Sequence, residues 1–276
     1  MGFDCDYIEG LKNLANRMRR DILDITYGAG VNGGHIGGAF SCAEIFAVLY
    51  GHVLKNNPKK VLAGDRDRFI LSKGHVALAH YAILKEAGYL TEEELRSFEH
   101  KGSKFSTHEV MYIEKGIEVS NGSLGYGLSV GIGCALAARK KHLEYKTYVL
   151  VGDGECNEGT VWEAVMAARR FGLDNLILIV DNNKQSLDGY TSDIMPINDG
   201  VKVFEGFGWN VCCVEDGNDV EQLIDAFDNR IEKGKPNVIW ANTVKAKGLT
   251  EEGKIGWHHV RIDGEMYEKL VKEVMN

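Results

Sequence analysis

The spacing of hydrophobic residues predicts helices and strands along most of the chain. In residues 6–27 apolar side chains recur every three or four positions, which is typical of an amphipathic helix. The second half instead alternates short apolar runs with helical segments. Strands are predicted at 147–152, 175–180, 209–214 and 237–243, and helices at 158–171, 199–207 and 218–233. Near-continuous apolar strands that alternate with helices indicate a mostly parallel sheet with helices on both faces.

The first half adds one short buried strand and several helices. The strand is predicted at 65–72, and helices at 43–54, 76–88, 128–142 and, near the end of the chain, 265–275. Two S/T-x-x-E patterns, Ser41 with Glu44 and Thr91 with Glu94, predict capping boxes that open helices. Residues 99–127 are polar and glycine-rich, and an irregular segment of this length is usually functional. Since no Pro- or Ser-rich linker divides the chain, we expect a single α/β domain over residues 1–276.

Composition narrows the class of partner. The chain has 32 basic and 40 acidic side chains, for a net charge of −8, and no basic run, which argues against nucleic acid or an anionic membrane as the main partner. The start of the chain lacks the apolar core of a secretory signal, and the longest apolar runs are strand-sized. The six cysteines form no C-x-x-C pair, so free thiols and a cytoplasmic location are expected.

Residues 28–38 read GAGVNGGHIGG and contain a G-x-G-x-x-G pattern at Gly28, Gly30 and Gly33. A dinucleotide-binding turn needs a strand before this pattern and a helix directly after it. Here a helix is predicted before it, and the next helix is expected only from Ser41. The NAD interpretation is therefore disfavoured, and His35 becomes the residue of interest in this segment.

Two other patterns also lack their structural context. Residues 127–131 fit the G-x-S-x-G of a hydrolase, but Ser129 is expected to begin a helix rather than to follow a strand. The histidines show no metal-site spacing, since His108-Glu109 lacks a second His and His258-His259 are adjacent.

The strongest signal is Gly152-Asp153-Gly154, directly after the strand at 147–152. The next strand ends in Asn183, and the carboxyl ends of adjacent parallel strands lie together, at the edge where open α/β sheets bind ligands. A carboxylate, an amide oxygen and a main-chain carbonyl are suitable ligands for Mg²⁺ or Ca²⁺. The helix expected near residue 158 offers free N–H groups to an anion.

This combination resembles the thiamine diphosphate motif, and the whole chain is similar to the amino-terminal, diphosphate-binding domain of transketolase. Three further segments match the family's motifs in the family's order: residues 34–39 (GHIGGA) resemble S-G-H-P-G-A-P, residues 68–75 (RFILSKGH) resemble R-F-x-L-S-x-G-H, and residues 120–127 (SNGSLGYG) resemble T-x-G-x-L-G-x-G. The resemblance implies the thiamine-diphosphate-binding fold.

The resemblance also implies roles for individual residues. The metal, Mg²⁺ with Ca²⁺ or Mn²⁺ as alternatives, would be held by Asp153, Asn183 and the main-chain carbonyl of Gln185. The cofactor would be contacted by His75, Gly122, Ser123, Leu124, Gly154, Asn183 and His258. Three histidines, His35, His108 and His258, would face the sugar as proton carriers or oxyanion stabilisers. Glu158 would join an acidic network between the active sites of a dimer.

The chain departs from the family pattern at a few positions. Ile36 and Glu109 stand where proline is usual, and Gln185 is polar at a position that is often aliphatic. The family's H-G-x-A-P appears as His258-His259-Val260-Arg261, so the choice of His258 over His259 stays open.

A full transketolase has roughly twice this length, so the resemblance implies the first subunit of a split transketolase. A carboxyl-terminal subunit would supply the pyrimidine-binding half, in an α2β2 heterotetramer, and the chain would be active only with it. The expected reaction moves a two-carbon ketol unit from a ketose, with an anionic tail such as phosphate, to an aldose. The alternatives are an α subunit of a 2-oxo acid dehydrogenase-type thiamine enzyme and a non-catalytic scaffold.

Overall fold

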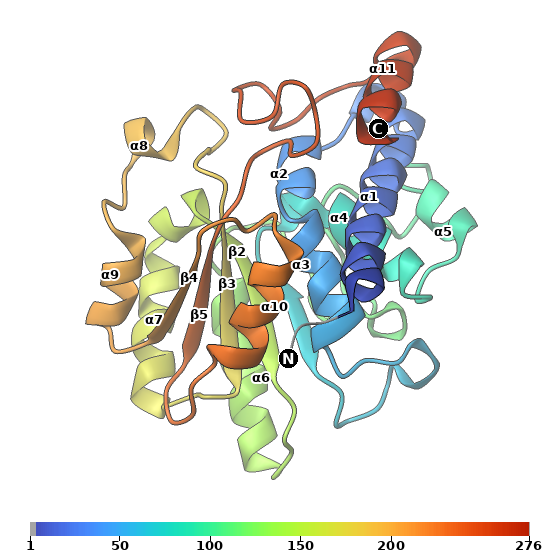
Figure 1. Ribbon diagram of the computed structural model, residues 1–276. Coiled ribbons are helices and arrows are strands. Elements are labelled where there is room, and N and C mark those ends of the chain that lie inside the picture. The colour runs from blue at the N-terminus through green and yellow to red at the C-terminus, as the bar shows by residue number, and fades with distance from the viewer. Residues whose placement is uncertain (1–3, 276) are drawn as a thin grey trace.

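The structure, a computed structural model, describes residues 4–275, and within this range the chain forms a five-stranded sheet (Figure 1). The strands are β1 (Arg68–Leu71), β2 (Thr147–Gly152), β3 (Leu176–Asn182), β4 (Asn210–Val214) and β5 (Asn237–Asn242). Their order is β1-β2-β3-β5-β4, and every neighbouring pair is parallel. The predicted parallel sheet is confirmed, with the 65–72 strand shortened because the Asp67 carboxylate accepts bonds from the main chain of Lys55 and Lys146.

Helices cover both faces of the sheet (Figure 1). They are α1 (Cys5–Gly28), α2 (Ile36–Ser41), α3 (Ala43–Val48), α4 (Ala77–Glu86), α5 (Glu92–Arg96), α6 (Gly127–Lys140), α7 (Gly159–Phe171), α8 (Thr191–Ile194), α9 (Gly200–Gly206), α10 (Val220–Asn229) and α11 (Gly264–Met275). A π-helical turn, Leu49–Val53, continues α3.

Alternate residues of each strand pack into two separate cores. Tyr148 and Leu150 of β2 join the core formed with α1 to α4 and α10, whereas Val149 and Val151 join the core formed with α6, α7 and α9. Side chains of a strand point alternately to opposite faces, so strands covered on both sides must be apolar at nearly every position. This explains the continuous apolar runs in the sequence.

One predicted capping box is confirmed and the other is wrong. Thr91 and Glu94 exchange the two bonds of a capping box at the start of α5, at 3.1 and 2.9 Å. Ser41 instead ends α2, and its hydroxyl donates to the Asp181 carboxylate at 2.6 Å. The Glu44 carboxylate accepts a bond from Arg19. Long-range partners have thus replaced the local capping bonds.

The glycine run serves close packing. Helix α1 precedes it, so the strand that a dinucleotide turn requires is absent, although α2 begins at Ile36 and not, as expected, at Ser41. Residues 33–37 lie against residues 257–260, and we call the two segments together the glycine clasp. Gly34 and Val260 exchange two main-chain bonds of 2.9 and 3.0 Å, and the N–H of Gly37 donates to the Trp257 carbonyl at 2.9 Å. A side chain at Gly37 would overlap that carbonyl.

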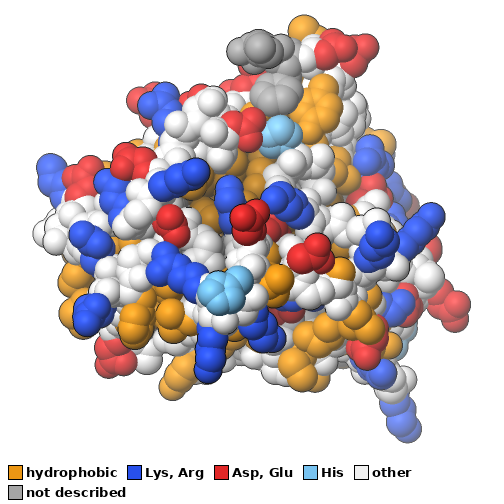
Figure 2. Space-filling model, turned by 90° about the horizontal axis from the view of Figure 1, so that it is seen from below, with side chains coloured by type: hydrophobic (Ala, Val, Ile, Leu, Met, Phe, Trp, Pro, Cys, Tyr) orange, Lys and Arg blue, Asp and Glu red, His pale blue; other side chains and the backbone are white. Residues whose placement is uncertain are grey.

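No helix within residues 4–275 has the length and apolar character needed to cross a membrane. The face at the amino ends of the strands, seen in Figure 2, carries Lys and Arg side chains intermingled with Asp and Glu. Such mixed charge is typical of a solvated surface.

The clasp predicts a difference between two glycine substitutions. Gly37→Ala should lower the free energy of unfolding by about 1–3 kcal/mol, because the added methyl group must push the two segments apart. Gly10→Ala, on α1 with open space around it, should raise stability by roughly 0.5–1 kcal/mol. Urea unfolding of both variants would measure this, and equal effects would contradict the close-packing role.

Candidate active site

A cavity of about 390 Å³ lies at the carboxyl ends of the strands. It gathers most of the predicted site residues: His35, His75, His108, Gly122, Leu124, Asp153, Gly154, Asn183, Gln185 and His258. It also contains Lys73, Lys245 and Glu155, for which the sequence suggested no role. The segments that supply these side chains are far apart in the sequence, and the parallel sheet brings them to one edge.

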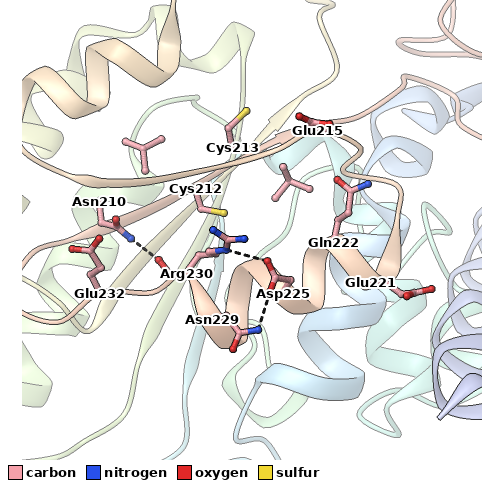
Figure 3. A pocket seen from close by; sticks show the side chains of 12 residues that line it. Asn210, Cys212, Cys213, Glu215, Glu221, Gln222, Asp225, Asn229, Arg230 and Glu232 are labelled. Carbon is pink, nitrogen blue, oxygen red and sulfur yellow. Dashed lines mark hydrogen bonds and ion pairs between the residues drawn. The ribbon is translucent and has the colours of Figure 1, made fainter. Parts of the chain in front are cut away.

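A larger cavity, of about 690 Å³, lies along β4 and α10, and none of the predicted site residues lines it (Figure 3). Its one arginine, Arg230, is paired with Asp225 at 3.0 Å. Its two cysteines, Cys212 and Cys213, project to opposite sides of the strand (Figure 3). The chemistry-bearing residues therefore single out the smaller cavity as the candidate site.

A buried ion pair underlies the candidate site. The Lys73 amine, just beyond β1, donates to the carboxylate of Asp181 in β3, and both side chains are almost fully buried. Burial alone would raise the pKa of Asp181, but the Lys73 charge and the hydrogen bonds from Lys73, Ser41 and Thr243 together lower it. The same carboxylate accepts bonds from Ser41, from Thr243 and, at 3.0 Å, from the Asn183 amide. These bonds fix the side chain of Asn183.

Asp153 lies at the end of β2 and is suited to a cation. It is 7% exposed, and the strands place it near Asn183, because Gly152 pairs with Asp181. Burial, followed by the negative charge of Asp181, raises the pKa of Asp153 to about 6. A nearby cation would offset both effects.

The donor set fits a hard metal ion. It comprises one carboxylate, one amide oxygen and one carbonyl, and oxygen donors of this kind suit Mg²⁺ or Ca²⁺. Among residues 4–275, no group of three or more His, Cys, Asp or Glu side chains could hold a metal. A metal here would thus need further ligands from an anion or from water.

Two lysines, Lys73 and Lys245, lie among the carboxylates of the cavity lining. The Lys245 amine donates to the Ser186 carbonyl at 3.1 Å and lies 3.5 Å from the Gln185 carbonyl and 3.3 Å from Nδ1 of His258. Burial, followed by the charge of Lys73, lowers the pKa of Lys245 to about 8. The two positive charges repel each other. An anion bound beside both lysines would reduce this repulsion and would itself be stabilised.

Four imidazole rings surround His35. Ring centroids lie 5.5 Å away for His75, 6.0 Å for His108, 5.2 Å for His258 and 4.7 Å for His259. Burial, followed by the neighbouring His258 and His259, lowers the pKa of His35 to about 3. Among the residues that the structure describes, its Nδ1 is buried without a hydrogen-bond partner. His35 is thus a neutral imidazole with one nitrogen unused by the protein.

The structure separates His258 from His259. His258 lines the cavity, whereas His259 is exposed beside His35 and outside the lining. The glycine clasp sets this arrangement, because Val260 is paired with Gly34. The choice of His258, left open by the sequence, agrees with this geometry.

Two predicted residues lie outside the cavity. Ser123 is exposed and borders a small neighbouring cavity with Gly122. Glu158 is exposed at the N-cap of α7. Neither contributes to the cavity wall within this chain.

The residues that the sequence reasoning missed follow a rule that could have found them. Lys73 and Lys245 come two and three residues after the ends of β1 and β5, and Asp153 comes one residue after the end of β2. Polar residues just beyond the carboxyl ends of parallel strands are placed at the ligand-binding edge.

Comparison with solved structures identifies the class of protein. Transketolase from Leishmania mexicana matches 96% of this chain with a TM-score of 0.89 and 32% identity. The chain covers 41% of that structure, so it spans about two fifths of a solved transketolase. Fold and site together define an α/β protein with the thiamine diphosphate-binding fold.

The sequence comparisons identify the family. The family described as "Transketolase, thiamine diphosphate binding domain" matches residues 12–272, and the chain belongs to it. The chain is 40% identical to one subunit of the apulose-4-phosphate transketolase of Actinobacillus succinogenes, covering 96% of this chain and 95% of the relative. It is 38% identical to 6-deoxy-6-sulfo-D-fructose transketolase subunit SqwG of a Clostridium species, covering 96% of each. These relatives support a transketolase-type enzyme.

The low pKa of His35 predicts how stability responds to acid. Below pH 6.5 the unfolded chain binds a proton at this histidine that the folded chain does not bind, so stability is lost as the pH falls from about 6.5 toward about 3. His35→Gln should therefore lose less stability between pH 7.5 and pH 5 than the unaltered chain. Urea unfolding at both pH values measures the difference, and an equal or larger loss in the variant would show that His35 titrates normally.

Proposed function

We propose that this chain binds thiamine diphosphate and Mg²⁺ in a two-subunit transketolase, which transfers a two-carbon ketol unit from a ketose to an aldose. The observation that carries the proposal is the cavity at the carboxyl edge. It joins the side-chain oxygen donors of Asp153 and Asn183, two lysines and a cluster of imidazole rings around His35. The first two features suit a metal-bound diphosphate, and the third suits a sugar.

The described residues fit the metal and the diphosphate. Asp153, Asn183 and the Gln185 carbonyl would hold Mg²⁺, or Ca²⁺ or Mn²⁺ in its place. The cofactor would lie against His75, Gly122, Ser123, Leu124, Gly154 and His258, with Lys73 and Lys245 supplying positive charge. When bound, thiamine diphosphate supplies the carbon nucleophile that breaks and forms carbon–carbon bonds beside a carbonyl.

The histidines of this chain would transfer protons to and from the sugar. A neutral imidazole can accept a proton at one nitrogen and donate from the other. His35 lines the cavity, and burial lowers its pKa to about 3, which supports this role for a neutral imidazole. His108 and His258 line the same cavity and would orient the hydroxyl and carbonyl oxygens. Glu158, exposed at the N-cap of α7, would join an acidic network between the active sites of the assembly.

A second subunit would complete the site. Relatives that this chain matches over nearly their whole length are named as single subunits of a transketolase, not as the whole enzyme. The partner would be a carboxyl-terminal subunit with the pyrimidine-binding half, in an α2β2 arrangement. The names of two relatives specify a phosphorylated and a sulfonated sugar, which supports a ketose with an anionic tail. We place this assembly in the cytoplasm on the basis of its free thiols.

The need for a partner predicts that the purified chain alone lacks ketol transfer, while the two-subunit complex has it. The measurement is the disappearance of a ketose phosphate donor in the presence of an aldose phosphate acceptor, thiamine diphosphate and Mg²⁺. Robust transfer by the chain alone would disprove the requirement for a second subunit.

Two substitutions should separate cofactor binding from catalysis. Asp153→Asn replaces a charged metal ligand by a neutral one and should weaken Mg²⁺-dependent cofactor binding by roughly tenfold or more. His35→Ala should leave that binding within about threefold and lower turnover at saturating cofactor by roughly 10²–10⁴-fold. Calorimetric titration of the complex and steady-state rates test both. If His35→Ala instead lost cofactor affinity and kept its turnover, the assignment of His35 to the sugar would be wrong.

A further inference from the structure

A polar cluster centred on the buried residues His80 and Glu109 lies outside the cavity lining, and the proposed chemistry gives it no role. Nδ1 of His80, on α4, lies 2.5 Å from Oε1 of Glu109, and the Tyr50 hydroxyl lies 2.7 Å from Nε2 of His80. The second carboxylate oxygen of Glu109 accepts a bond of 3.0 Å from the Asn121 amide. His80 and Glu109 are only 1% and 2% exposed. We call these four residues the α4 anchor.

Two of the four anchor residues are adjacent in sequence to candidate site residues. Glu109 follows His108, and Asn121 precedes Gly122. Glu109 and Asn121 share two further hydrogen bonds: the N–H of Glu109 donates to Oδ1 of Asn121 at 2.9 Å, and the N–H of Asn121 donates to the Glu109 carbonyl at 3.0 Å. The Asn121 amide also donates to the carbonyl of Leu71, the last residue of β1, at 3.1 Å. The loop between α5 and α6, residues 97–126, is therefore hydrogen-bonded to α4 through Glu109 and to β1 through Asn121.

The anchor itself is held rigidly. The His80 ring packs against the rings of Phe46 and Phe69, with centroid distances of 5.7 and 5.0 Å. A close-packed aromatic environment leaves a buried side chain little freedom to move. Asn121 also lies so close to Gly74 that any side chain at Gly74 would overlap it, and the next residue is His75. The anchor thus adjoins three of the candidate site residues.

The loop needs such a support because it has little structure of its own. Between α5 and α6, residues 97–126 form only one helical turn, Ile113–Lys115, and the rest is irregular. The placement of an irregular segment depends on individual hydrogen bonds. A displacement of about 1 Å in an active-site group can cost a hundredfold in rate, so the support would affect turnover.

We propose that Glu109, held by His80, is a positioning residue that fixes His108 and the turn at Gly122 in the cavity wall. Neither Glu109 nor His80 lines the cavity, so their effect on the reaction passes through their neighbours. The importance of His108 for turnover rests on the proposed function, whereas the anchoring of the loop does not.

Two substitutions of similar size test the proposal, because each keeps one of the two His80 bonds. An asparagine amide can occupy the position of Nδ1, and a glutamine amide that of Nε2. His80→Asn therefore keeps the donor to Glu109 and loses the bond to Tyr50. His80→Gln keeps the bond to Tyr50 and leaves the Glu109 carboxylate without its buried partner.

The two variants are compared in the two-subunit complex at saturating cofactor. The loop is followed by amide hydrogen exchange of residues 106–126, and catalysis by kcat and KM for the sugar. His80→Gln should raise exchange in the loop and lower kcat by roughly tenfold or more, while His80→Asn keeps at least about a third of the kcat and normal exchange.

Equal kcat and equal exchange in the two variants would overturn the proposal, since His80 would then only fill space. Should His80→Gln fail to fold, Glu109→Met serves in its place: it removes both carboxylate oxygens, so the bonds to His80 and to the Asn121 amide are lost, and it should loosen the loop and lower kcat in the same way. Unchanged exchange and kcat in Glu109→Met would then overturn it. A complex of unaltered chains without ketol transfer would refute the proposed function, and the exchange comparison alone would still decide whether His80 anchors the loop.

Discussion

The buried ion pair between Lys73 and Asp181 is the interaction on which the arrangement of the site depends. It joins the carboxyl end of β1 to that of β3, and Asp181 also receives bonds from Ser41 of α2 and from Thr243 beyond β5. Removal of one member of such a pair leaves a buried charge without compensation, at a cost of about 3–5 kcal/mol. The pair therefore sets the position of Asn183, and the charge of its Lys73 member adds to burial in lowering the pKa of a second lysine, Lys245.

Hydrophobic periodicity was sufficient to predict the sheet, because strands covered on both faces have a characteristic apolar pattern. The parallel pairing of β2 with β3 then placed Asp153 near Asn183 without knowledge of any contact. The partners of Asp181 could not be predicted in this way. They depend on how helices and loops pack over the edge, as Ser41 shows, where a bond across 140 residues replaced a local capping box.

The glycine-rich segment illustrates how a short motif changes its meaning with its context. Its letters match a phosphate-binding turn, but α1 comes before it and the glycines of the clasp allow two backbones to touch. That contact determines where two histidines lie. It holds His35 among the other imidazole rings, and it places His258, but not His259, in the cavity wall. The α4 anchor has a comparable relation to His108. In both places, residues outside the cavity determine where the histidines of the cavity lie.

The central claim is that the carboxyl edge of this sheet holds a metal-bound diphosphate between Asp153, Asn183 and the two lysines. A crystal structure of the two-subunit complex with thiamine diphosphate and Mn²⁺, with an anomalous difference map at the manganese edge, tests it directly. We predict one strong peak within about 2.0–2.4 Å of oxygen atoms of Asp153, Asn183 and the Gln185 carbonyl, with the diphosphate beside Lys245. A peak at another place, or a diphosphate bound away from this edge, would contradict the account.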